Sequence, residues 1–260
     1  MQLNELLKKI DETKSAIDKI RPLSENEIKE LFSYYRVGLT YTSNALEGNT
    51  LTLNETKILL EDGITVGGKP LKYIYEAVGH SDAYDFMVRC ATDKNYIIKE
   101  DDILYLHYLF YNKIAPENAG VYKKQQNYIT GSNHIPASIE DVPVLMKDFV
   151  KQLNEKWNSE HPVVLSAFAH KGLVDIHPFI DGNGRTARLL MNLILVNKGY
   201  QIISIPVRER LNYFHAVEDS RSKIKSKKEA FNIFIAKSEI EAQKEFCKIL
   251  HIDSSKLKEK

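Results

Sequence analysis

The stretch from His177 to Arg188 holds the side chains and backbone best suited to chemistry. It reads HPFIDGNGRTAR, follows a predicted helix that ends near residue 175, and leads into a strongly apolar helix predicted to begin near Arg185. Two glycines, Gly182 and Gly184, let the backbone approach a ligand closely, and the free N–H groups at a helix start attract anions. The stretch therefore predicts a binding site for phosphate groups.

The charged side chains of this loop fit phosphate chemistry. Arg185 and Arg188 share one face of the first helical turn, where two cations are favourable only if anions occupy the site. Asp181 supplies an oxygen ligand of the kind that Mg²⁺ takes together with phosphates. His177 could accept a proton from a hydroxyl nucleophile. An ordinary turn with surface ion pairs would explain any one of these residues, but their combination favours a catalytic loop.

The same loop resembles the Fic family motif, His-x-Phe-x-(Asp/Glu)-Gly-Asn-Gly-Arg-x-x-Arg, and fills every fixed position of it. The resemblance covers the chain from near residue 101 to near residue 222. Members of the family are all-helical apart from a flap, and their usual activity is the transfer of AMP from ATP to a Ser, Thr or Tyr hydroxyl of a protein. The resemblance thus implies ATP as cosubstrate, Mg²⁺, and a protein target with a hydroxyl side chain, self-modification included.

The resemblance also implies catalytic roles for residues in the first part of the motif. His177 would be the general base for the target hydroxyl. Asp181 would hold Mg²⁺ on the α- and β-phosphates. Asn183, with the backbone around Gly182 and Gly184, would stabilise the charge that develops on the α-phosphate.

The remaining implied roles concern nucleotide binding. Arg185 and Arg188 would hold the β- and γ-phosphates, and Phe179 would anchor the loop in the core. Asn212 and Tyr213, on a later helix, are the residues that we expect near the adenine base.

A second match lies upstream, at Ser43-Asn44-Ala45-Leu46-Glu47-Gly48. It resembles the inhibitory motif (Ser/Thr)-x-x-x-Glu-(Gly/Asn) of the family. Ser43 and Glu47 lie on one helix face, and a carboxylate near a helix C-terminus costs a few tenths of a kcal/mol to about 1 kcal/mol. The resemblance implies that Glu47 pairs with Arg188 and excludes the ATP γ-phosphate. We therefore expect an adenylyltransferase that is autoinhibited in cis.

Residues 120–136 break the helical pattern of the chain. Their β-branched and aromatic residues surround a Gly-Ser-Asn turn, which predicts a β-hairpin. This hairpin resembles the Fic flap, which holds a target segment as an added strand. The residues that we assign to target docking are Thr130, Gly131, Ser132 and His134.

Elsewhere, apolar residues recur at helical spacing. Capping boxes at Ser24 and Thr52 predict two helix starts, and further helices are predicted over 73–89, 101–112, 141–157, 162–175, 185–197 and 211–222. The expected fold class is all-α, a Fic-type helical bundle with a β-hairpin flap beside the catalytic loop. Its expected parts are an N-terminal helical region (1–98) with the inhibitory helix, a catalytic core (99–222) and a helical basic tail (223–260).

The composition narrows the partners and the location. The 260 residues include 36 Lys+Arg and 35 Asp+Glu, a net charge of +1, whereas nucleic-acid binding relies on a basic excess. Cys90 and Cys247 lack the spacing of a zinc site, no stretch is long enough to span a bilayer, and no secretory leader is visible. We expect a cytoplasmic protein without membrane or nucleic-acid partners, in which the short basic cluster 221–228 is a solvated face.

Several questions stay open at this level. The same site could remove AMP from a modified target, or transfer another nucleotide-linked group such as UMP or phosphocholine. The chain could also be a non-enzymatic regulatory binding module. Formation of a homo-oligomer could relieve the inhibition, but no sequence feature identifies an interface.

Overall fold

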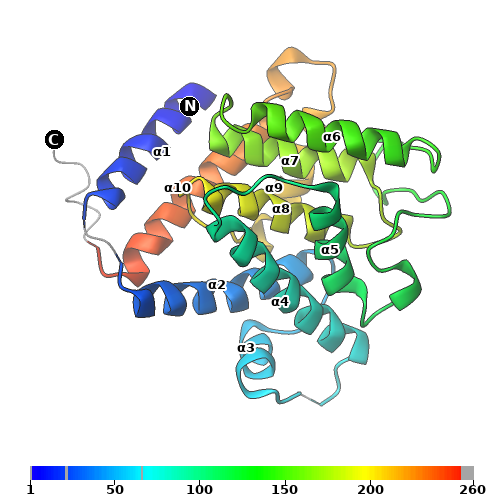
Figure 1. Ribbon diagram of the computed structural model, residues 1–260, viewed down its shortest axis with the longest axis horizontal. Coiled ribbons are helices and arrows are strands. Elements are labelled where there is room, and N and C mark those ends of the chain that lie inside the picture. The colour runs from blue at the N-terminus through cyan, green and yellow to red at the C-terminus, as the bar shows by residue number, and fades with distance from the viewer. Residues whose placement is uncertain (1, 21–22, 66, 253–260) are drawn as a thin grey trace.

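The computed structural model describes residues 2–20, 23–65 and 67–252, and these residues form an all-helical bundle (Figure 1). The α-helices are α1 (Leu3–Asp18), α2 (Glu25–Leu46), α3 (Leu53–Asp62), α4 (Leu71–Thr92), α5 (Glu100–Tyr111), α6 (Val142–Lys156), α7 (Pro162–Ile176), α8 (Asn183–Asn197), α9 (Arg210–Ser220) and α10 (Ala230–Ile249). Three short 3-10 turns are η1 (Pro116–Asn118), η2 (Val207–Glu209) and η3 (Lys225–Lys227). Residues 253–260 of the expected tail lie outside the described part.

Both predicted capping boxes are confirmed. Ser24 accepts a hydrogen bond from the backbone N–H of Glu27, and the Glu27 carboxylate accepts one from the N–H of Ser24. Thr52 and Glu55 make the same reciprocal pair at the start of α3. These caps satisfy N–H groups that no helical carbonyl can reach, so α2 and α3 begin where the sequence places them.

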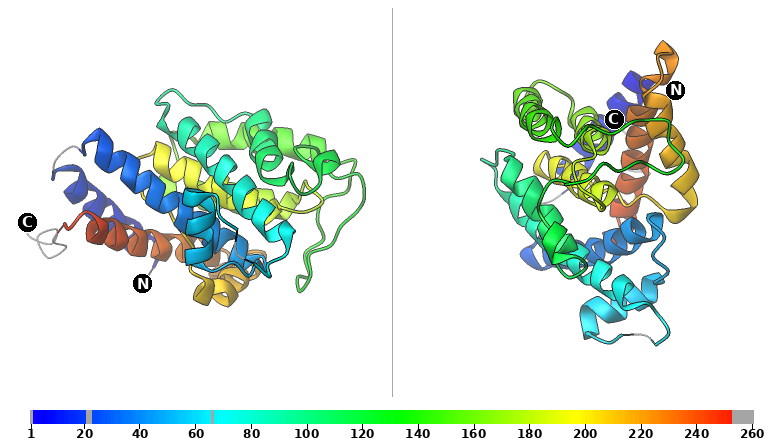
Figure 2. Two further views of the ribbon diagram at one scale, coloured as in Figure 1. Left: turned by 90° about the horizontal axis from the view of Figure 1, so that it is seen from below. Right: turned by 90° about the vertical axis from the view of Figure 1, so that its right-hand side faces the viewer.

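The helix α8 lies in the middle of the bundle, with other helices around it in both views of Figure 2. It packs against α7, α4 and α5, and most of its residues are buried. Asn192, on this helix, donates a hydrogen bond to the carbonyl of Ile203 and accepts one from the N–H of the same residue. The central helix therefore also fixes the segment that leads to α9.

The first and last α-helices pack together in the fold. The helix α1 packs along α10, which also contacts α7 and α9 (Figure 1). Leu3, Leu6 and Ile10 of α1 join the same apolar core as residues of α7, α8 and α10. The helix α2 packs against α4. The helix α3, which follows α2, packs against the N-terminal part of α4, where Leu59 meets Ile74 and Ala77.

The predicted β-hairpin is not formed, because the described residues contain no strand. The turn itself is present: the N–H of Ser132 donates to the carbonyl of Ile129, and Gly131 has a φ of +79°. This positive φ explains why glycine occupies the position. Figure 2 shows the segment as a long loop at one edge of the bundle.

A backbone N–H group in each arm beside this turn bonds to the end of α7 or to the catalytic loop. The N–H of Lys123 donates to the carbonyl of Pro178 (2.8 Å), and the N–H of Ala137 donates to the carbonyl of Ile176 (3.3 Å). A β-ladder needs these backbone groups for its own cross-strand bonds. The segment contains strand-forming residues, but these two backbone N–H groups bond to Pro178 and Ile176 and cannot join a β-ladder.

Two expectations from composition can be compared with the structure. Among the described residues, no helix combines the length and the apolar character needed to cross a membrane.

Cys90 and Cys247 are free thiols, and burial raises the pKa of both. Less thiolate forms at neutral pH when a thiol pKa is raised, so neither cysteine has the character of a nucleophile.

Close packing of α4 on α5 yields a first prediction. A methyl group on Gly79 would collide with the backbone carbonyl of Phe110, whereas one on Gly38 of α2 would meet only Ser204 Oγ at 4.0 Å. We expect Gly79→Ala to lower the free energy of unfolding by about 1–3 kcal/mol. Gly38→Ala should leave it unchanged or raise it by up to about 1 kcal/mol. Urea unfolding measures both, and equal effects of the two substitutions would contradict the packing.

Candidate active site

The expected general base, His177, follows directly after α7. Its backbone is left-handed (φ 55°, ψ 57°), and its N–H still donates to the carbonyl of Leu173 at 2.9 Å. Pro178 cannot continue the helix, so the chain must leave it here. The ring Nδ1 lies 3.3 Å from the carbonyl of Val174. A hydrogen bond to a carbonyl requires a proton on Nδ1, which leaves the lone pair of Nε2 to accept another proton.

The surroundings keep His177 neutral. Burial lowers its pKa to about 4, and the positive charges of Lys123 and Arg221 act in the same direction. The Val174 carbonyl and the Asp181 carboxylate oppose this lowering without reversing it. At neutral pH the imidazole is therefore unprotonated and can act as a base.

The loop after His177 is closed around Phe179. The Phe179 ring is fully buried and stacks on His107, with 3.8 Å between ring centroids and parallel planes. Asn183 Oδ1 accepts from the N–H of Phe179, and Asn183 Nδ2 donates to the Phe179 carbonyl, both at 2.9 Å. The predicted anchor role of Phe179 is confirmed. The side chain of Asn183 serves this loop closure, which sequence reasoning did not anticipate.

The start of α8 has the geometry that favours an anion. Gly182 is the N-cap with a φ of 80°, so the N–H groups of the following turn lack helical partners. The carboxylate of Glu47 lies against Gly184 in this turn, where a side chain in place of the glycine hydrogen would meet Glu47 Oε1 at 2.5 Å. A negative charge is favourable there because the helix dipole is positive at its N-terminus. The anion at this site is the carboxylate of Glu47, from the same chain.

Arg188 is held by residues from two other helices. Its Nε donates to Ser43 Oγ (2.9 Å), and its Nη2 donates to the Ser43 carbonyl (2.9 Å) and to Glu47 Oε1 (2.7 Å). Its Nη1 donates to the hydroxyl of Tyr213 at 3.2 Å. Only 1% of the Arg188 side chain is exposed. The contact of Glu47 with Arg188, which the resemblance implied, is therefore present, and the bonds from Arg188 to Ser43 add to it.

Glu47 is ionised in this arrangement. Burial alone would raise its pKa, but the charges of Arg188 and Arg185 and the hydrogen bond from Arg188 outweigh that effect and lower it. The same charges offset the unfavourable position of Glu47 at the C-terminal end of α2.

Asp181 is the expected metal ligand. Its side chain is half-exposed, and its Oδ1 accepts from the N–H of Gly182 (2.6 Å) and from Arg185 Nη2 (3.3 Å). Among the described residues, no three His, Cys, Asp or Glu side chains cluster as a metal-binding group. A single exposed carboxylate fits Mg²⁺, since that ion takes one or two carboxylates and completes its shell with phosphates and water.

Arg185 differs from Arg188 in its partners. Its Nη1 lies 3.0 Å from Glu76 Oε1, its Nη2 contacts Asp181, and its guanidinium lies 4.3 Å from the ring centroid of Phe110. Sequence reasoning missed Glu76, which is a single acid within α4. Nothing local distinguishes it from a surface residue, because its partners come from distant parts of the chain.

The two residues expected near adenine lie in different environments. Tyr213 is buried, with 2% exposure, and its hydroxyl donates to Nε2 of the neutral His170 at 2.9 Å while accepting from Arg188. The Tyr213 ring therefore packs in the core and supports Arg188, and its contact with adenine stays a prediction. Asn212 is exposed on α9, where its Nδ2 donates to Glu209 Oε2 at 2.8 Å.

The residues expected to dock a target surround the turn of the flap segment. Thr130 and Gly131 are exposed at the tip. Ser132 Oγ donates to Glu218 of α9 (2.7 Å), and the ring Nε2 of His134 lies 2.8 Å from the carbonyl of Asp175. The turn is therefore fastened to the bundle on one side and exposed to solvent on the other.

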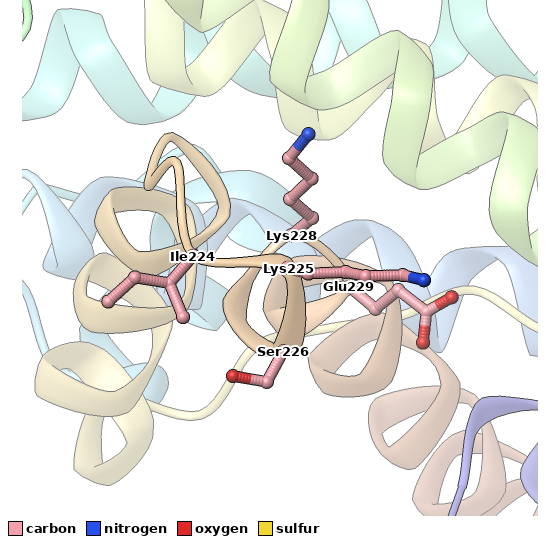
Figure 3. A pocket seen from close by; sticks show the side chains of 5 residues that line it. All are labelled: Ile224, Lys225, Ser226, Lys228 and Glu229. Carbon is pink, nitrogen blue, oxygen red and sulfur yellow. The ribbon is translucent and has the colours of Figure 1, made fainter.

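The basic cluster lies between α9 and α10. Residues 223–229 are exposed, and Lys227 pairs with Asp219. A shallow hollow in this loop is lined by Ile224, Lys225, Ser226, Lys228 and Glu229, whose side chains point in different directions (Figure 3). None of the catalytic-loop residues lines it, so this hollow is separate from the candidate active site.

Comparison with known proteins agrees with the motif. Residues 97–195 match the model of the Fic/DOC family. The protein adenylyltransferase Fic of Drosophila mojavensis is 42% identical over 176 residues, which are 67% of this chain and 34% of the relative. That of Drosophila melanogaster is 39% identical over 176 residues, 67% of this chain and 35% of the relative. The chain thus spans about a third of the length of these curated relatives.

Solved structures extend the similarity beyond the catalytic loop. Fic-1 of C. elegans (residues 134–508) superposes with a TM-score of 0.84 at 29% identity, covering 96% of this chain and 74% of that one. A Fic domain containing signaling protein of Bacteroides thetaiotaomicron gives a TM-score of 0.80 at 29% identity, covering 92% and 95%. The similarity therefore includes the helices on both sides of the region that the family model matches.

The buried support of Arg188 yields a second prediction. Tyr213→Phe removes one hydroxyl and leaves Arg188 Nη1 and His170 Nε2 without their shared partner. We expect the free energy of unfolding to fall by about 1–3 kcal/mol, the cost of leaving buried polar groups unsatisfied. Tyr128→Phe is the matched control, because Tyr128 is 76% exposed and should change stability by less than about 0.5 kcal/mol. Equal urea midpoints for the two variants would show that Tyr213 is not needed to hold Arg188.

Proposed function

We propose that this chain, which carries a Fic domain across residues 97–195, is a protein adenylyltransferase held inactive by its own Glu47. It would transfer AMP from ATP to a Ser, Thr or Tyr hydroxyl of a target protein. The observation that carries the proposal is the carboxylate of Glu47, which lies on the first turn of α8 and bonds to Arg188. The Glu47 carboxylate lies where the phosphates of ATP would bind under this proposal.

Proton transfer is the task of His177. Its Nε2 would take the proton of the target hydroxyl while Nδ1 remains bonded to the Val174 carbonyl. The hydroxyl oxygen would bond to the α-phosphorus of ATP, and the bond from that phosphorus to the oxygen bridging to the β-phosphate would break. The products are an AMP ester of the target and pyrophosphate, so atoms and charge balance with the proton on His177.

Phosphate binding is the task of the α8 N-terminus and its neighbours. The N–H groups after Gly182 and the guanidinium of Arg188 would bind phosphate oxygens, because both present donors and positive charge. Asp181 would hold Mg²⁺, which when bound neutralises phosphate charge. The left-handed Gly182 and the Asn183–Phe179 bonds keep this turn in place before the nucleotide arrives.

Inhibition follows from competition for one guanidinium. Nη2 of Arg188 donates to Glu47 Oε1 and to the Ser43 carbonyl, both on the inhibitory segment. A γ-phosphate that needs this donor must displace Glu47, or the nucleotide must bind in a displaced pose. Release of the end of α2 would therefore activate the enzyme.

Glu47→Gly supplies the direct test. We expect ATP-dependent labelling of a target, or of the protein itself, to rise at least about tenfold, equivalent to about 1.4 kcal/mol in the barrier. Adding His177→Ala to this variant should abolish labelling. Asp62→Gly, which removes an exposed acid from the end of α3, is the matched control and should not activate. If the Glu47 variant bound ATP but labelled no better than wild type, Glu47 would not be the brake.

The same protein distinguishes the remaining alternatives. Incubation of Glu47→Gly with labelled ATP, UTP and GTP in a cell lysate identifies the preferred nucleotide and the target. Release of AMP from a modified target by the wild type, but not by the Glu47 variant, would instead assign removal of AMP to this site. Binding of nucleotide without any transfer would favour a regulatory module.

The neutral state of His177 yields a pH prediction. Its pKa of about 4 lies below the ordinary value of 6.5, so the free base is present at all pH values above about 5. For Glu47→Gly, kcat/KM should stay level as the pH falls from 7 to about 5 and decline as it falls through about 4. Circular dichroism at each pH separates this decline from acid unfolding. A decline centred near pH 6.5 would show that the base is not the buried imidazole.

A further inference from the structure

Glu76 is a buried carboxylate outside both recognised motifs. It lies in α4, and 4% of the residue is exposed. An ionised carboxylate is tolerated at such a position only when cations or hydrogen-bond donors compensate for the lost water. Its partners therefore indicate what it does.

One oxygen of Glu76 faces the catalytic loop. Glu76 Oε1 lies 3.0 Å from Nη1 of Arg185, and Nη2 of the same guanidinium donates to Oδ1 of Asp181 at 3.3 Å. The Phe110 ring lies against this guanidinium. Arg185 is thus a bridge between a buried acid and the acid expected to bind Mg²⁺, and it is 3% exposed.

The other oxygen of Glu76 is fixed from the opposite side. Asn49 Nδ2 donates to Glu76 Oε2 at 2.9 Å and to the Tyr73 carbonyl at 3.1 Å. The N–H of Leu51 donates to Asn49 Oδ1, so the amide itself is held by the backbone. Glu76 therefore has little freedom to follow a movement of Arg185.

We propose that Glu76 is a positioning residue that holds Arg185, so that Arg185 orients the Asp181 carboxylate toward bound Mg²⁺ and phosphate. This inference rests on the proposed function of the same site. The hydrogen bonds from Gly182 and Arg185 both go to Oδ1 of Asp181. They leave Oδ2 available to a metal ion, the single-oxygen contact that suits octahedral Mg²⁺.

The two arginines of the motif then have different tasks. Arg188 is paired with Glu47, whose side chain is 29% exposed and lies at the end of a helix. Arg185 is paired with Glu76, whose side chain is 6% exposed and lies within α4, a helix that packs directly on α8. Departure of Glu47 would leave the Glu76–Arg185 pair in place. Charge rather than directed bonding holds this pair, because Nη1 and Nε of Arg185 have no hydrogen-bond partner among the described side chains.

The test is Glu76→Gln in the Glu47→Gly background, with α,β-methylene ATP as a probe that cannot be turned over. Calorimetry measures its affinity across a Mg²⁺ titration. We expect the Mg²⁺ concentration for half-maximal tightening to rise by about 10-fold or more, the usual effect of removing a residue that supports a metal ligand. Affinity for the metal-free nucleotide should change less than about twofold. An unchanged Mg²⁺ requirement in a folded variant would overturn the proposal.

Two further variants distinguish a specific role of Glu76 in positioning Arg185 from a general destabilisation of α4. Asp82→Asn lies on the same helix but removes an exposed pair with Lys113, so it should leave the Mg²⁺ requirement unchanged. Glu76→Asp keeps the charge and should restore part of the shift seen with Gln. If Glu76→Gln does not fold, the Asp variant carries the test, since its shorter reach should still raise the Mg²⁺ requirement. A shift with Asp82→Asn as large as with Glu76→Gln would contradict a specific role.

The outcome does not depend on transfer of AMP. If Glu47→Gly bound the analogue with a Glu76-dependent Mg²⁺ requirement but labelled nothing, the adenylyltransferase proposal would fail while this inference would stand. If labelling succeeded and the requirement did not move, only this inference would fail.

Discussion

A fully buried guanidinium imposes the main constraint on this bundle. Arg188 is 1% exposed, and the interior tolerates such a charge only when its donors are bonded and an anion balances it. Ser43 and Glu47 on α2 and Tyr213 on α9 meet this requirement together. The end of α2 and the start of α9 must therefore lie beside α8. The helices that surround the catalytic loop are positioned by the need to satisfy one side chain as well as by apolar packing.

The same constraint explains how a carboxylate can substitute for a phosphate. Glu47 presents a negative oxygen to the two groups that bind phosphate well, a helix N-terminus and a guanidinium. Its lowered pKa keeps it charged, so Arg188 has an anionic partner in this arrangement. A nucleotide would supply the replacement anion as Glu47 leaves. Under the proposed function, inhibition and activation would be an exchange of anions at one cation, in which the buried charge stays balanced.

Sequence reasoning could identify the parts of the site whose residues lie next to one another in the chain. The loop from His177 to Arg188 carries the expected base, the expected metal ligand and the expected anion-binding backbone within twelve residues of sequence. The hairpin failed because strand propensity does not reveal that the arms bond to the catalytic loop. The buried contacts of Tyr213 with Arg188 and His170 were missed because helical spacing alone does not show which side of α9 faces the core. Glu76 was missed because a single acid acquires meaning only from partners that tertiary packing supplies.

The packing of α2 against the bundle changes along its length. Its earlier turns bury apolar side chains such as Tyr35 and Leu39, which anchor the helix against the core. Toward its end the buried residues are mostly polar, including Thr40, Ser43 and Asn44, with Leu46 the apolar exception. Hydrogen bonds between neutral groups there contribute only about 0.5–1.5 kcal/mol net each, whereas those from the Arg188 guanidinium contribute about 1.5–3 kcal/mol. The end that carries Glu47 is therefore held mainly by its bonds to Arg188, which nucleotide phosphates would replace under the proposed function, while the apolar contacts between α4 and α8 keep the rest of the loop in place.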